Sequence, residues 1–123
     1  MLGALRAVRH RTANQLQVAF GWAQLGEAEG AREALERLVA EEALLSALSR
    51  SGDEAEQMDF WQVFAAAERA GQALSFRGRA ADVAPGALRE LLPRLRAGLA
   101  RGAARVRVEV RADGTAVVAE EEA

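Results

Sequence analysis

The apolar positions in the first half of the chain recur with helical spacing. Residues 2–25 contain no proline, and their apolar side chains share one side of a helical wheel: Leu2, Leu5, Val8, Ala13, Leu16, Ala19, Phe20 and Ala23. A second stripe comprises Ala31, Ala34, Leu35, Leu38, Leu45 and Leu48. Gly26 suits the C′ position after the first helix, and the polar run 49–53 ends the second. The pattern predicts two helices in an antiparallel hairpin.

The second half mixes helical and alternating patterns. Residues 54–70 form a third helical run that carries Met58, Phe60, Trp61, Phe64 and Ala65. Residues 73–78 and 104–111 alternate as strands do, and Asp113-Gly114 predicts a turn into a last strand at 115–120. A helix is expected from about Pro85 to Gly102, with Pro93 kinking or dividing it. The fold class predicted is α+β, with a small α/β domain beside the hairpin.

We place a domain boundary between residues 1–52, the hairpin, and residues 53–123, the α/β domain. Two helices alone cannot enclose a core, so we expect two hairpins to pair into a dimeric four-helix bundle. On this view Leu5, Leu16, Leu38 and Leu45 need cover from a second copy. The alternative is that the second half of the chain covers the stripe.

Composition excludes several classes of function. The 123 residues are 50% apolar and carry a formal net charge of −2, which disfavours a nucleic-acid binder. The absence of cysteine excludes disulfides and thiolate metal sites. No apolar run approaches the roughly 20 residues that span a bilayer, and the arginine-containing N-terminus does not match a signal peptide. We therefore expect a cytoplasmic protein that binds neither nucleic acid nor membrane.

The candidate chemistry centres on His10, the only histidine. Asn14, Gln17 and Gly21 follow at +4, +7 and +11, so helical geometry aligns them with His10 in one exposed polar strip. A lone histidine on a helix surface is ordinarily just solvated. With no second histidine there is no metal site, and no Ser–His–Asp arrangement is present.

The stretch from Arg9 to Val18, with Gly21 and Leu25-Gly26 after it, resembles a known phosphoacceptor helix. It is similar to the sporulation initiation phosphotransferase B family and to the dimerisation helices of citrate- and malate-type sensor kinases. Their pattern is roughly R-H-D-x-x-N-x-L-Q, followed by L-G at the hairpin turn. The resemblance covers about the first 50 residues. It departs at Arg11, where the family carries an acidic residue that assists attack on ATP.

The resemblance implies a dimeric four-helix bundle joined to a degenerate histidine-kinase-ATPase-like domain. In sensor kinases that domain binds ATP through an asparagine-rich helix and a glycine-rich loop. Here the helix at 91–102 contains no asparagine, Arg94 and Gly98 stand where the two amides are expected, and no glycine-rich loop follows the Thr115 strand. We therefore expect no ATP binding and no ATP-dependent kinase activity.

The function implied is histidine phosphotransfer in a bacterial sporulation-type phosphorelay, in which His10 carries a phosphoryl group between the aspartates of response-regulator receiver domains. The resemblance gives the chain no cofactor of its own, because the regulator brings its Mg²⁺. Residues expected to meet the regulator are Arg6, Arg11, Asn14, Gln17 and Gly21. The alternative is a catalytically inactive dimeric module that docks a regulator without turnover, which Arg11 favours.

Overall fold

The computed structural model describes residues 2–121, with side chains for residues 11–121. Its elements in chain order are α1 (Leu2–Gln24), α2 (Ala28–Arg50), α3 (Glu54–Arg69), β1 (Ala73–Arg77), the short 3₁₀ helix η1 (Ala80–Asp82), α4 (Ala87–Ala100), β2 (Arg105–Val110) and β3 (Ala116–Glu121). The α+β class predicted from the sequence is confirmed. Each long helix and each strand lies within a few residues of its predicted position.

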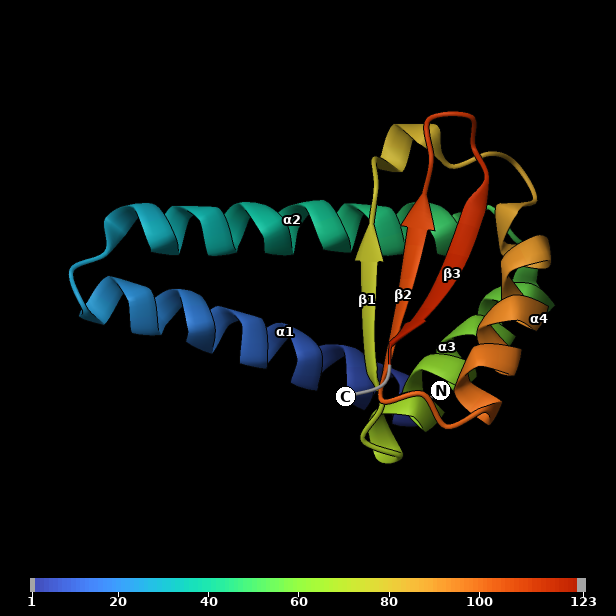
Figure 1. Ribbon diagram of the computed structural model, residues 1–123, viewed down its shortest axis with the longest axis horizontal. Helices are drawn as coiled ribbons and strands as arrows, with labels where there is room; N and C mark the ends of the chain where they lie inside the picture. Colours follow the sequence, from blue (N-terminus) through green and yellow to red (C-terminus); the bar gives the residue numbers. More distant parts are fainter. Residues whose placement is uncertain (1, 122–123) are drawn as a thin grey trace.

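Helices α1 and α2 form the predicted antiparallel hairpin, whose turn lies at the end far from the sheet (Figure 1). Gly26 adopts a φ of 77°, a left-handed conformation that a side chain disfavours. The amides of Gly26 and Glu27 donate to the carbonyls of Ala23 (3.1 Å) and Trp22 (2.9 Å), which is a Schellman C-cap. The Trp22 ring then packs on Gly30, where an added Cβ would lie 3.0 Å from it. The left-handed Gly26 and these two hydrogen bonds therefore form the hairpin turn at the position that the sequence predicts.

The sheet has the strand order β1-β2-β3, with β1 parallel to β2 and β2 antiparallel to β3. Buried and exposed residues alternate along β1 and β2, so the sheet has one buried face and one open face. The buried face packs on α2, α3 and α4 and carries Leu74, Phe76, Val106, Val108 and Val110. The other face is open and includes Arg77, Arg105 and Glu109. The molecule is thus a helical layer on one side of a small sheet, with the far half of the hairpin projecting past β1 (Figure 1).

The hydrophobic core crosses the predicted boundary at residues 52 and 53. Leu45 and Leu48 of α2 belong to the same buried cluster as Phe60 and Phe64 of α3 and the buried face of the sheet. The expectation that Leu38 and Leu45 need a second copy is therefore wrong, because both are buried within one chain. Leu16 does remain exposed, and the Leu5 side chain lies outside the described residues. The division into two domains stays a prediction.

Helix α4 corrects one expectation about Pro93. The helix runs through Pro93 without a break, so this residue does not divide it. Pro93 is exposed, and the Arg89 carbonyl that loses its helical donor can be hydrated on that side. No helix among residues 2–121 is both long enough and apolar enough to cross a membrane.

The predicted turn between β2 and β3 is confirmed around Asp113 and Gly114. Gly114 has a φ of 88°, and the Arg111 amide donates to the Thr115 carbonyl at 2.9 Å. The hydroxyl and the amide of Thr115 both donate to the Asp113 carboxylate, at 2.6 and 2.9 Å. These hydrogen bonds lower the pKa of Asp113 because they favour its charged form.

Candidate functional site

The predicted polar strip lies on the α1 helix. Position 10 is within its described backbone, in helical register with Asn14, Gln17 and Gly21, but the side chains of Arg6 and His10 lie outside the described residues. Asn14 and Gln17 are exposed, as expected, and Gly21 is half-buried with no atom within 4 Å of an added Cβ. Asn14 also lines a hollow with Glu68 and residues 71–74, so the end of α3 and the start of β1 lie beside this part of the strip.

Arg11 does not lie on a solvated helix face. Its side chain is only 15% exposed and forms an ion pair with Glu41 of α2. Its Nη1 donates to the Leu74 carbonyl of β1 at 2.7 Å. The guanidinium also lies over the rings of Phe64 and Phe76, 5.7 and 6.0 Å from their centroids. Arg11 thus connects three elements within the chain, and the partner-binding role predicted for it stays a prediction.

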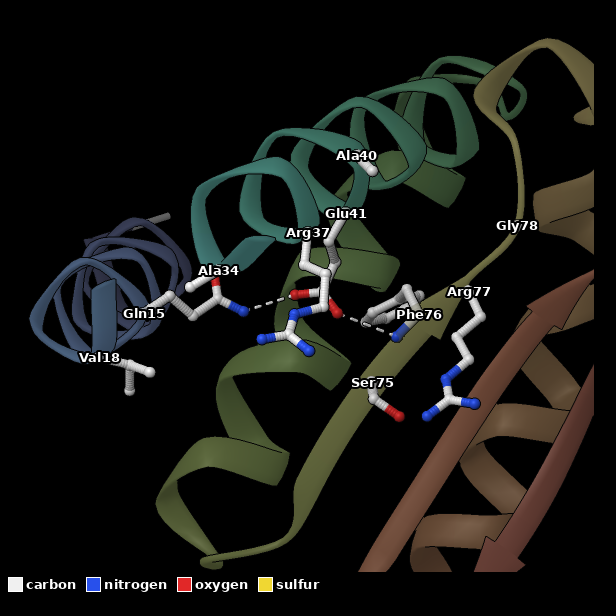
Figure 2. A pocket seen from close by; sticks show the side chains of 10 residues that line it. All are labelled: Gln15, Val18, Ala34, Arg37, Ala40, Glu41, Ser75, Phe76, Arg77 and Gly78. Atoms are coloured by element: carbon white, nitrogen blue, oxygen red, sulfur yellow. Dashed lines mark hydrogen bonds between the residues drawn. The ribbon is translucent and has the colours of Figure 1, made fainter. Parts of the chain in front are cut away.

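Glu41 completes this connection from the other helix. One carboxylate oxygen accepts from Arg11 and from the Gln15 amide (2.8 Å), while the other accepts from the Phe76 backbone amide at 3.2 Å. Figure 2 shows the bonds from Gln15 and Phe76. The Leu74 carbonyl and the Phe76 amide belong to the outer edge of β1, beside which no strand lies within residues 2–121. We call Arg11, Gln15 and Glu41, with their two β1 partners, the edge clamp. It joins the hairpin to the α/β domain by satisfying backbone groups of an edge strand.

The opposite side of the hairpin carries exposed apolar side chains. The Thr12 hydroxyl donates to the Glu42 carboxylate at 2.8 Å, which shows that these two positions share a side. Helical spacing extends that side over four residues, which we call the apolar ridge: Leu16, Phe20, Leu35 and Val39. They are 46%, 64%, 43% and 67% exposed, respectively. The α/β domain does not cover this ridge, because it packs on the side that holds the edge clamp.

Helix α4 occupies the place where the resemblance expects nucleotide-binding amides. Arg94 is held by the sheet, since its Nη1 donates to the Ala116 carbonyl at 3.2 Å. Gly98 is buried, and an added Cβ would lie 3.1 Å from the Glu120 carboxylate. Arg101 hydrogen-bonds that carboxylate and lowers the pKa of Glu120. Arg94 and Gly98 thus both contribute to the packing of α4 against β3.

The chain was compared with family models, with curated proteins and with solved structures. None of them matches it. The resemblance therefore rests on the motif from Arg9 to Gly26, and the function that it implies is a proposal.

Sequence reasoning missed the edge clamp. Arg11 and Gln15 are four residues apart on α1, and Glu41 is on another helix, so no local spacing joins them to β1. One signal was present: an arginine next to the candidate histidine, where the helices that α1 resembles carry an acid. The structural role of this arginine could be recognised only once the position of β1 was known.

Proposed function

We propose that this chain is a histidine phosphotransferase of a sporulation-type phosphorelay, active as a dimer. His10 would receive a phosphoryl group from the aspartyl phosphate of one receiver domain and donate it to the aspartate of another. The observation that carries the proposal is the register of α1. It aligns position 10 with Asn14 and Gln17, whose side chains are both exposed.

The dimer is supported by the apolar ridge. Phe20 and Val39 expose about two thirds of their side chains, with Leu16 and Leu35 beside them. A second hairpin packed on this ridge makes a four-helix bundle and removes these partly buried side chains from water, each contributing roughly 1–2 kcal/mol. The polar strip is on a different side of α1 from the ridge and stays available in such a dimer.

The chemistry requires a neutral imidazole and an activated donor. An imidazole nitrogen attacks the phosphorus of the acyl phosphate, the new P–N bond forms, and the P–O bond to the aspartate carboxylate breaks. The receiver's carboxylate is the leaving group, so this chain needs no strong acid. Its contribution is position: a histidine on a rigid helix with Asn14 and Gln17 beside it to orient the receiver. The Mg²⁺ of this reaction belongs to the receiver.

ATP has no role in this proposal. The chain's only asparagine is Asn14, so α4 offers none of the amides that hold a nucleotide in sensor kinases. Arg94 and Gly98 are instead engaged with β3. We expect calorimetry with Mg-ATP to give no saturable heat, and micromolar binding would contradict this part of the proposal.

The second candidate is a docking module without turnover. It is favoured by Arg11, which replaces the acidic residue of the family and is committed to the edge clamp. Such a module would bind a receiver domain on the same strip and hold or sequester it.

Label transfer separates the two candidates. The purified chain is incubated with each phosphorylated response regulator of its host, and label on the chain is tested for stability. A phosphohistidine is labile to acid and stable to base, whereas an aspartyl phosphate is labile to base. We expect acid-labile, base-stable label on the wild type and none on His10→Ala or His10→Gln. Arg69→Gln, on α3, serves as the control that keeps its label.

Binding is measured in the same mixtures by calorimetry. A wild type that binds a regulator but never acquires label would establish the docking module and reject the phosphotransferase. If the chain neither binds nor is labelled by any regulator, both candidates are wrong.

A further inference from the structure

A groove of about 530 Å³ lies between the hairpin and the outer edge of β1. Its walls come from three elements: Gln15 and Val18 of α1, Ala34, Arg37, Ala40 and Glu41 of α2, and residues 75–78 at the end of β1 (Figure 2). It is separate from the apolar ridge, which is on the other side of the hairpin. Its size is that of a small-molecule site.

The charges in this groove do not cancel. Among the residues that the structure describes, Glu41 is the only acidic one that lines it, and its carboxylate is already paired with Arg11. Arg37 and Arg77 also line it, and neither forms an ion pair with any residue in the described part of the chain. Two cations that form no ion pair therefore share one hollow, and Glu109, the β2 register partner of Arg77, lies on the same open face of the sheet. Their mutual repulsion is relieved when an anion lies between them.

The donors in the groove suit an oxyanion. Figure 2 shows the guanidinium of Arg37 reaching down from α2, and the guanidinium of Arg77 beside the Ser75 hydroxyl on β1. Guanidinium groups present paired N–H donors that match the oxygens of phosphate and carboxylate. Both oxygens of Glu41 already accept hydrogen bonds within the edge clamp, and Glu41 forms its ion pair with Arg11 rather than with Arg37 or Arg77.

We propose that this groove binds the phosphate or carboxylate group of a small anionic molecule. Arg37 and Arg77 hold the oxyanion from two sides, and the Ser75 hydroxyl adds a third donor. The ligand touches α2 and β1 together, so it bridges the hairpin and the α/β domain beside the edge clamp. Bound ligand therefore stabilises the placement of the hairpin on the domain. This site uses none of the residues of the polar strip and does not depend on phosphotransfer at His10.

Three probes test the site and identify its preferred group. Calorimetry at low ionic strength, where screening is weak, is performed with inorganic phosphate, phenyl phosphate and benzoate. The last two share a ring and differ in the anionic group, so their affinities distinguish phosphate from carboxylate. We expect saturable binding of at least one probe, and a higher melting temperature of the protein in its presence.

Single variants assign the binding to the groove. Arg37→Gln and Arg77→Gln should each weaken binding about tenfold or more, since each removes a charge-assisted donor. Arg105→Gln removes an exposed arginine of β2 that does not line the groove, and should leave the affinity within about twofold. Circular dichroism establishes that each variant is folded. Absence of saturable binding by all three probes, or equal weakening by Arg105→Gln, would overturn the site.

Discussion

At the scale of single residues, Arg11 has the clearest physical role in the described structure. It is largely buried, yet its charge is met by Glu41 and its Nη1 by a backbone carbonyl. A charge removed from water is tolerated only when such partners replace the solvent. Arg11 is therefore a structural residue, whatever else position 11 does for a partner.

Loss of the Arg11 charge should loosen the hairpin from β1. Arg11→Met keeps the apolar stem and leaves the Glu41 carboxylate, which is 13% exposed, without its ion-pair partner. We expect the free energy of unfolding to fall by about 2–4 kcal/mol, measured by urea denaturation. The matched control is Arg32→Met, because Arg32 pairs with Glu29 and Glu36 at 61% exposure. Such an exposed ion pair contributes only about 0.5 kcal/mol or less. We therefore expect Arg32→Met to lower the free energy of unfolding by no more than this amount.

A double variant tests whether the pair itself is responsible. Adding Glu41→Gln to Arg11→Met removes the unpaired charge and should recover part of the loss. Equal effects of Arg11→Met and Arg32→Met would refute the clamp. Arg11→Asp restores the acidic residue of the resembling family, but here it places a second carboxylate beside Glu41. We expect that variant to lose more stability than Arg11→Met.

At the scale of elements, sequence signals located every long helix and every strand because those signals are local. The hairpin turn depends on Gly26 and the bonds around it, and the β2–β3 turn depends on Asp113-Gly114. Pro93 does not divide α4, and the reason is tertiary. Leu92 and Leu95 on either side of it are buried, and this packing holds α4 together through the missing hydrogen bond.

The hairpin turn offers a matched pair of glycines for substitution. Gly26→Ala forces a side chain into a φ of 77° and should destabilise the protein by about 1 kcal/mol. Gly21→Ala, inside α1 with open space around the added Cβ, should instead stabilise it by about 0.5–1 kcal/mol. Thermal unfolding followed by circular dichroism measures both. Effects of the same sign would mean that the turn geometry is wrong.

At the scale of the whole molecule, the two sides of the hairpin have different roles. One side meets the α/β domain through the edge clamp, and the other exposes the apolar ridge. Leu16 and Phe20 can therefore be changed without disturbing the core of one chain.

The wild type should be a dimer at micromolar concentration, with twice the chain mass of 13.2 kDa by light scattering. Leu16→Glu and Phe20→Glu each place two charges in a symmetric interface, one from each copy. We expect each to raise the dissociation constant about a hundredfold or more while the helix content is kept. Met58→Glu, on α3 at 45% exposure, is the control that should stay dimeric. A monomeric wild type would contradict the dimer.

The sequence by itself determined the class of the fold, the order of its elements and the strip of α1 that holds position 10. These follow from periodicity and turn chemistry, which act between residues close along the chain. Only the tertiary structure decided that Leu45 is buried within one chain, that Arg11 meets Glu41 and Leu74, and that Arg37 and Arg77 share a groove. The physical reason is distance along the chain: Arg11 and Leu74 are 63 residues apart, and only the packing of α1 beside β1 brings them within 2.7 Å.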